Sequence, residues 1–297
     1  MNDLPATDRM LRLAYLPPWD WQHFQRFFAQ RLLPGVELLD AQRYARSFRI
    51  GAVSSWFAVS PLPDEHALAL TMGSDAHELT QALVLKVRRM FDLDADLERI
   101  AAHFASDALL GPLLAGHPPL RLPAAFDPFE QAVRAIVGQQ ITVKAAVTIT
   151  RRLVERLGET LSDAPADQPQ RLFPTPEALA GADLAAIGMP GKRVQTLQRF
   201  AVAVADGALQ LHVEDGPEEL VRRLRELPGI GPWTAEYIAL RGFGAADAFP
   251  AADLGLLKAP LWGEAGISAS QLQARAEAWR PFRAYAALHL WHNYSGA

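Results

Sequence analysis

Asp253 is the residue in this sequence whose setting best suits chemistry. It lies in the segment FPAADLGLLK, residues 249–258, after a proline turn and directly before Leu254, Leu256 and Leu257. This position predicts a helix N-cap, at which the carboxylate accepts a backbone N–H. A carboxylate at a helix N-terminus stays ionised, as a reaction that develops positive charge requires. The two interpretations, helix cap and catalytic carboxylate, are compatible.

A glycine-rich hairpin, LPGIG at residues 227–231, lies upstream of Asp253 between two predicted helices. The spacing predicts a helix over 218–226 and a second helix from Pro232 to Gly242. Gly229 and Gly231 would let backbone N–H groups approach an anion such as a DNA phosphate without a Cβ in the way. Such a nest would position the protein on a duplex without reading its sequence. A tight turn between packed helices explains the hairpin equally well.

Other polar residues fit a reactive site less well. Asp247 is the nearest rival carboxylate, but it precedes the turn in a Gly-Ala-Ala context. His289 and His292 are three residues apart on a predicted helix, a spacing that could bind a metal ion. Neither an acidic residue nor a cysteine lies near this pair in the sequence. We therefore do not expect a histidine metal site.

Composition indicates an ordinary soluble protein. The chain has 297 residues, of which 50% are hydrophobic and 21% charged, so two or three domains are expected. It has no cysteine, which excludes disulfides, thiolate metal sites and iron–sulfur clusters. The N-terminus lacks a basic region followed by an apolar core, and no apolar run is long enough to span a bilayer. We expect a cytoplasmic protein.

The charge distribution offers weak support for binding DNA. The net charge of −4 is unfavourable for a phosphate-binding protein. Two windows without acidic residues nevertheless carry basic side chains, one between Glu130 and Glu155 and one between Asp183 and Asp206. Solvated helix faces commonly produce such windows. Their basic residues are Arg134, Lys144, Arg151 and Arg152 in the first and Lys192, Arg193 and Arg199 in the second.

Periodicity divides the chain into a mixed N-terminal part and a helical remainder. An amphipathic helix is predicted over 20–33, an antiparallel meander over 43–50, 53–59 and 66–71, and a helix over 75–91. Almost only helix is predicted from Leu93 onward, broken by a proline-rich connection at 117–123. The helical segments are predicted at 127–137, 143–157, 178–187, 192–205 and 270–294, with an exposed loop at 161–176.

The hairpin, the second helix and Asp253 together resemble the helix-hairpin-helix DNA glycosylases, whose invariant aspartate begins the helix after that pair. The resemblance to the 3-methyladenine DNA glycosylase II family covers nearly the whole chain. The matching stretches, in the family's order, are PPWD at 17–20, YARS at 44–47, LRLP at 120–123, FEQAVRAI at 129–136 and LHLW at 288–291. The lack of cysteine separates the chain from the branch with a four-cysteine cluster.

This resemblance implies an α+β, mostly α, fold in which an antiparallel α+β domain precedes two helical domains. The implied boundaries are 1–92 for the N-terminal domain and 124–245 for the helix-hairpin-helix domain. A helical domain carrying the catalytic aspartate would combine 93–123 with 246–297. The implied activity is that of a monofunctional DNA glycosylase of base excision repair. It would flip alkylated cationic bases such as 3-methyladenine or 7-methylguanine out of the duplex and hydrolyse their N-glycosidic bonds.

The resemblance also assigns roles to individual residues. Asp253 would be catalytic, and Gln140 would be the wedge that fills the gap left by the flipped base, a position held by leucine in the best-known member. Without the resemblance, aromatic residues at helical spacing would more simply predict core packing. Three departures from the family point to a more open pocket with one carboxylate: Leu254 and His292 replace tyrosines and Ala252 replaces an acid. The implied base pocket consists of Trp233, Tyr237, Trp291 and Phe27.

Double-stranded DNA with alkylated bases is the implied partner of a monomeric protein in the bacterial cytosol, without membrane contact. Gly229, Gly231, Lys192 and Arg193 would contact the DNA. No cofactor is required, but the backbone carbonyls of Arg225, Leu227 and Gly229 would hold a monovalent cation, Na⁺ or K⁺. The alternative is a non-catalytic helix-hairpin-helix protein that binds DNA structures, for which Asp253 and an aromatic cleft would have no purpose.

Overall fold

A computed structural model describes residues 10–116, 119–162 and 164–295. The chain forms two compact units, each built from separate segments. The first unit contains the chain up to residue 88 together with 137–205, and the second contains 89–136 together with the chain from 206 onward. The three-part domain division stays a prediction. None of the helices in the described ranges is long and apolar enough to cross a membrane.

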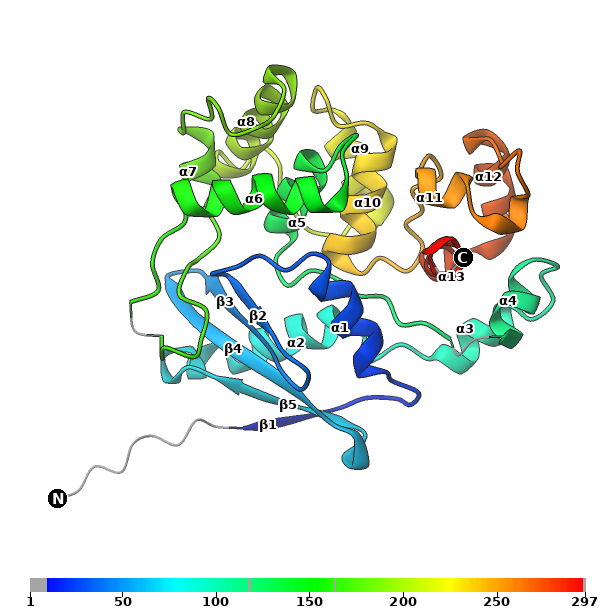
Figure 1. The fold of residues 1–297 in the computed structure, drawn as a ribbon, viewed down its shortest axis with the longest axis horizontal. Helices are drawn as coiled ribbons and strands as arrows, with labels where there is room; N and C mark the ends of the chain where they lie inside the picture. The colour runs from blue at the N-terminus through cyan, green and yellow to red at the C-terminus, as the bar shows by residue number, and fades with distance from the viewer. Residues whose placement is uncertain (1–9, 117–118, 163, 296–297) are drawn as a thin grey trace. The chain divides into compact units, whose positions relative to one another are not determined.

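The first unit contains a five-stranded antiparallel sheet in the order β1-β5-β4-β3-β2 (Figure 1). The predicted meander is present as β3, β4 and β5, and two short strands extend its edges. Runs of three and four residues are too short to show a clear alternation, which is why these edge strands were not predicted. The strands are β1 (Leu11–Ala14), β2 (Glu37–Leu39), β3 (Tyr44–Ile50), β4 (Val53–Leu62) and β5 (Ala67–Met72).

Helix α1 (Trp21–Ala29) packs on this sheet through its apolar stripe. Asp20 caps the helix by accepting the Gln22 N–H at 2.8 Å. Phe24 and Phe28 are buried, and the Phe28 ring lies 4.8 Å from the Tyr44 ring on β3. The predicted helix over 75–91 is divided into a 3₁₀ segment, Ser74–Leu79, and α2 (Thr80–Met90).

The segment 161–176, predicted to be an exposed loop, is a loop, but part of it packs on the sheet. Leu161 is only 7% exposed and packs with Trp56 in a small apolar cluster. Ser47 donates its hydroxyl to the Arg171 carbonyl at 2.5 Å, and Arg49 pairs with both carboxylate oxygens of Glu159. The predicted loop is confirmed, but its full exposure is not, because a polar, proline-rich composition does not reveal contacts with strands more than a hundred residues away.

Three helices complete the first unit: α6 (Val143–Leu157), α7 (Pro176–Ala180) and α8 (Gly191–Ala205). The predicted helices over 143–157 and 192–205 are confirmed as α6 and α8. Helix α7 is shorter than the predicted 178–187, because it ends at Gly181 and Asp183 then accepts the Ala185 N–H in a turn.

The second unit is helical, and most residues of its helix α10 (Pro232–Phe243) are buried. Six of the other helices of this unit lie on either side of α10 in the sequence: α3 (Leu97–Phe104), α4 (Leu110–Gly116), α5 (Pro128–Val137), α9 (Pro217–Arg225), α11 (Leu254–Leu257) and α12 (Ala269–Ala276). The last helix is α13 (Arg283–Ser295). A mostly helical fold with an N-terminal antiparallel sheet was predicted, and the structure confirms it.

The C-terminal run predicted as one helix over 270–294 is two helices. Helix α12 ends at Ala276, a 3₁₀ turn follows at Glu277–Trp279, and α13 begins at Arg283. Pro281 lies in the break and has no N–H to continue a helical ladder. Because of this break α13 has its own direction, and it carries Trp291 into the site described below.

Candidate active site

Asp253 begins α11 and accepts four N–H donors. Its Oδ1 accepts the backbone N–H groups of Gly255 at 2.9 Å and Leu256 at 3.3 Å, so the predicted N-cap is confirmed. The indole Nε1–H of Trp291 also donates to Oδ1, at 2.8 Å. The indole Nε1–H of Trp233 donates to the other oxygen, Oδ2, at 2.8 Å. These donors come from three helices, α10, α11 and α13.

The two oxygens of this carboxylate are therefore not equivalent. A carboxylate oxygen offers about two lone-pair directions, and Oδ1 of Asp253 already receives three donors. Within the part of the chain that the structure describes, Oδ2 accepts only the indole N–H of Trp233, so it has room for a further partner. Because Asp253 is half-buried, Oδ2 is the oxygen that can meet a substrate or a water molecule.

Gly255 makes the approach of Trp291 to Asp253 possible. A Cβ built on Gly255 would lie 3.1 Å from Cδ1 of Trp291 and 3.2 Å from Oδ1 of Asp253. Both distances are shorter than ordinary van der Waals contact, so a side chain at this position would displace both the indole and the carboxylate. Gly255 was not predicted as a site residue, although a glycine inside a predicted helix is a signal of close packing.

Three of the four predicted pocket aromatics lie together in the second unit. Trp233 and Tyr237, one turn apart on α10, stack with ring centroids 5.2 Å apart and an angle of 13° between planes. Tyr237 meets Trp291 edge to face, with centroids 6.3 Å apart and an angle of 80°. All three side chains are half-buried, unlike those of a closed core.

The fourth predicted pocket residue, Phe27, lies on α1 in the first unit. The Arg31 guanidinium sits 4.2 Å above its ring, and the ring packs edge to face on Phe28 at 5.6 Å. A place for Phe27 in the base pocket stays a prediction.

Arg241 is a charged residue of this region that was not predicted from the sequence. It follows Tyr237 by one turn of α10 and is only 5% exposed. Its guanidinium lies 5.0 Å from the ring centroid of Trp291, and its Nη1 donates to the Pro123 carbonyl at 3.0 Å. The spacing of Trp233, Tyr237 and Arg241 by four residues each was a signal that could have identified it.

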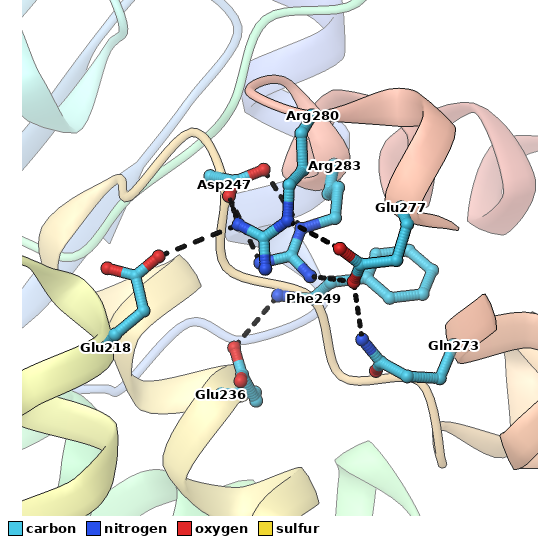
Figure 2. A network of polar contacts seen from close by, with 8 residues as sticks. All are labelled: Glu218, Glu236, Asp247, Phe249, Gln273, Glu277, Arg280 and Arg283. Carbon is cyan, nitrogen blue, oxygen red and sulfur yellow. Dashed lines mark hydrogen bonds and ion pairs between the residues drawn. The ribbon is translucent and has the colours of Figure 1, made fainter. Parts of the chain in front are cut away.

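A polar network holds the loop that leads to Asp253 (Figure 2). Asp247 pairs with the fork of Arg283, from Oδ1 to Nε at 2.9 Å and from Oδ2 to Nη2 at 3.1 Å, and also contacts Arg280. Glu236 of α10 accepts the backbone N–H of Phe249 at 2.9 Å. Burial raises the pKa of the Glu236 carboxyl. Asp247, the rival carboxylate, is thus occupied in anchoring the loop.

The hairpin 227–231 joins α9 to α10 as predicted. Ile230 is buried beneath it, and its N–H donates to the Leu227 carbonyl at 3.1 Å. Gly229 has φ of +95°, a conformation that a Cβ would strain. Gly231 is exposed, begins α10 as its N-cap, and has open space where a Cβ would be. Contact of this hairpin with DNA stays a prediction.

The remaining predicted DNA contacts lie in the first unit. Gln140 is exposed in the turn between α5 and α6 and has φ of +58°, an unusual conformation for a residue other than glycine. Lys192 is exposed and Arg193 half-buried in the first turn of α8. Their roles also stay predictions. Within the described residues no group of three or more His, Asp or Glu side chains could hold a metal ion.

Family models match both parts of the chain. A model described as the AlkA N-terminal domain matches residues 10–127, and one described as the HhH-GPD superfamily base excision DNA repair protein matches residues 133–282. The chain belongs to the HhH-GPD superfamily of base excision DNA repair proteins. In this superfamily member, Asp253, Trp233, Tyr237 and Arg241 lie within the matched segment, and Trp291 of α13 follows it.

Curated relatives extend the match over nearly the whole chain. DNA-3-methyladenine glycosylase 2 of Escherichia coli is 37% identical over 288 residues, which are 95% of this chain and 97% of the relative. A probable bifunctional transcriptional activator/DNA repair enzyme of Mycobacterium tuberculosis is 35% identical over 95% of this chain and 56% of its own length. These relatives confirm the prediction of a helix-hairpin-helix DNA glycosylase and do not favour a non-catalytic DNA-binding module.

Solved structures agree with this superfamily assignment. A 3-methyladenine DNA glycosylase from Archaeoglobus fulgidus covers 97% of this chain and 98% of its own, with a TM-score of 0.80 at 21% identity. A Schizosaccharomyces pombe 3-methyladenine DNA glycosylase in complex with abasic DNA covers 65% of this chain and 95% of its own, with a TM-score of 0.53 at 26% identity. The first of these likenesses concerns the fold alone.

Proposed function

We propose that this glycosylase removes alkylated purines from double-stranded DNA by hydrolysing the N-glycosidic bond. The observation that carries the proposal is the carboxylate of Asp253, held by the indole N–H groups of Trp233 and Trp291 beside an aromatic wall. The name of the Escherichia coli relative, DNA-3-methyladenine glycosylase 2, supports this class of substrate.

Asp253 acts through its charge. Loss of the base leaves positive charge on the sugar, and a fixed carboxylate stabilises that charge without having to reorganise. Oδ2, which retains acceptor capacity, faces the sugar or orients the attacking water. Because Oδ1 is held by three donors, the carboxylate cannot turn away when the charge develops.

The aromatic wall receives the flipped base. Trp233, Tyr237 and Trp291 offer ring surfaces, which suit a range of bases. Cation–π attraction favours a cationic base over its neutral parent by about 0.5–2 kcal/mol, which is at best roughly thirtyfold. Most of the discrimination therefore comes from the base itself, because a positively charged purine already has a weakened glycosidic bond. The enzyme therefore accepts a broad range of bases and releases some neutral bases slowly.

The enzyme releases the base without cutting the strand. Strand cleavage by bifunctional relatives needs an amine nucleophile that forms a Schiff base with the sugar. Trp233 occupies the corresponding position here, and its N–H donates to Asp253. Borohydride should therefore trap no covalent protein–DNA adduct; a trapped adduct would overturn this part of the proposal.

DNA is held by main-chain and basic groups. The hairpin at Gly229 and Gly231 binds a phosphate, Lys192 and Arg193 bind the backbone, and Gln140 fills the gap left by the base. The exposure and left-handed backbone of Gln140 support the wedge role, since strained residues cluster at functional sites. One chain carries the carboxylate, three pocket aromatics and the hairpin, so we propose a monomer.

A monovalent cation fits the hairpin. Arg225 is the last residue of α9, where carbonyls lack intrahelical partners, and the Leu227 carbonyl uses one lone pair on Ile230. The carbonyls of Arg225, Leu227 and Gly229 would hold Na⁺ or K⁺. Such a cation would add positive charge at the phosphate-binding turn.

The test is release of 3-methyladenine and 7-methylguanine from methylated duplex DNA by the wild type and by Asp253→Asn. Asparagine keeps the size of the side chain and an oxygen for the helix cap, so the variant should fold and bind DNA. Its rate of base release should fall at least about a hundredfold, as for other lost electrostatic groups. Asp215→Asn, at an exposed position, is the control and should release bases at the wild-type rate. Release of neither base by the wild type would favour the binding module.

A further inference from the structure

A buried positive charge lies behind the base-binding wall. The guanidinium of Arg241 covers one face of Trp291, with 5.0 Å between its Cζ and the ring centroid. The indole edge of Trp291 points to Asp253, and Tyr237 meets Trp291 edge to face. A base that stacks on Trp291 must therefore use the face opposite Arg241.

That geometry places the base within electrostatic reach of Arg241. A stacked base lies about 3.5 Å from the indole plane, so its ring is about 8–9 Å from the guanidinium. Arg241 is only 5% exposed, and the indole between the two groups excludes water. At an effective dielectric of about 20, two unit charges at this distance change an equilibrium by roughly ten- to thirtyfold. This is as large as the cation–π attraction that Trp291 can offer.

The sign of this effect depends on the charge of the base. When the glycosidic bond breaks, its electron pair moves onto the base, so a cationic base becomes neutral and a neutral base becomes anionic. In the transition state Arg241 attracts the negative charge that builds on a neutral base. It repels the positive charge that remains on a cationic base. The difference between the two bases is one full unit of charge, however far the bond has broken.

We propose that Arg241 sets the substrate range of the enzyme by acting through Trp291. The residue assists departure of bases that leave as anions and cancels much of the preference for cationic bases that an aromatic pocket would otherwise have. This inference rests on the proposed function, because it requires a base to stack on Trp291.

The experiment compares second-order single-turnover rate constants for 7-methylguanine, a cationic base, and hypoxanthine, a neutral base, in the same duplex. Arg241→Gln removes the charge but keeps a donor for the Pro123 carbonyl. We expect the ratio of the 7-methylguanine rate to the hypoxanthine rate to rise about ten- to thirtyfold in this variant. The ratio is measured within one preparation, so a reduced folded fraction does not change it.

Arg241→Lys is the matched control, because it keeps the charge and loses the planar guanidinium. The ratio of the 7-methylguanine rate to the hypoxanthine rate in this variant should stay within about threefold of the wild-type ratio. An unchanged ratio in Arg241→Gln, with both rates reduced by the same factor, would assign Arg241 a packing role and overturn the inference. Failure of the wild type to release either base would overturn the proposed function instead.

Discussion

A Cβ on Gly255 would lie 3.1 Å from Cδ1 of Trp291, so the first turn of α11 and the indole on α13 are in close contact. This contact brings the Trp291 N–H to Oδ1 of Asp253. Glycine is needed there for the space that its missing side chain leaves, because φ is not in the left-handed region.

Gly255→Ala should therefore reduce base release while leaving the fold and DNA affinity intact. The new methyl group would push Trp291 and Asp253 apart by a few tenths of an ångström, and misplacement of catalytic groups commonly costs about ten- to hundredfold in rate. Single-turnover rates and DNA affinity would be measured together. Gly116→Ala, where a Cβ meets nothing within 4 Å, is the control. A fully active Gly255→Ala would mean that the contact with Trp291 is not needed.

Trp233→Phe and Trp291→Phe separate the two roles of the indoles. Phenylalanine keeps an aromatic face but removes the N–H that holds Asp253. Loss of a hydrogen bond to a charged group costs about 1.5–3 kcal/mol, so each variant should lose roughly ten- to hundredfold in single-turnover rate with little change in DNA affinity. Loss of DNA affinity at an unchanged rate would contradict the positioning role.

Trp279 provides a matched control for these variants. It donates its indole N–H to Asp107 Oδ2 at 2.8 Å, the same bond that Trp233 and Trp291 make to Asp253. Because Trp279 is 1% exposed, Trp279→Phe should lower the thermal midpoint of unfolding. The single-turnover rate of base release per folded molecule should be the same in Trp279→Phe as in the wild type.

Gly231→Asp should weaken binding to every DNA sequence alike. The position is exposed, its φ of −84° suits any residue, and a Cβ there meets nothing within 4 Å, so the fold should tolerate the change. A negative charge at a phosphate-binding turn should cost about tenfold in affinity at moderate salt. Gly231→Ala should bind within about twofold of the wild type. If Gly231→Asp bound DNA as tightly as the wild type, the hairpin would not anchor the DNA.

Asp92 should make stability depend on pH. Burial raises the pKa of its carboxyl from 3.8 to about 6, against the hydrogen bonds that it accepts from the Leu122 N–H and the Tyr285 hydroxyl. The unfolded chain releases this proton near pH 4 and the folded chain near pH 6. The contribution of protonated Asp92 to stability is therefore complete below pH 4 and is lost as pH rises through about 6.

Asp92→Asn removes this titration while keeping an acceptor for the Leu122 N–H. The free energy of unfolding of the wild type, minus that of the variant, should fall by about 2 kcal/mol between pH 4 and pH 7. Urea unfolding at each pH would measure the difference. Parallel stability profiles for the two proteins would contradict a raised pKa at Asp92.

Several parts of this protein were determined by local sequence. The hairpin 227–231 follows from glycine conformations, and the cap at Asp253 follows from a short polar side chain before an apolar run. The central meander and the helices α6 and α8 follow from apolar periodicity over six or more residues. Each of these features depends on neighbours within a few positions, which is why one sequence is enough to predict it.

Tertiary structure alone decided how these parts meet. Asp247 and Asp253 are both aspartates of one loop, yet their contacts differ. Two indoles hold the Asp253 carboxylate at the site, whereas two arginines hold Asp247 as an anchor of the loop. Arg241 reaches Trp291 across fifty residues, and part of the segment 161–176 packs on a sheet whose strands are a hundred residues away. Hydrogen bonds and ring contacts of this kind depend on helix directions set by packing of the whole unit, and no local pattern encodes them.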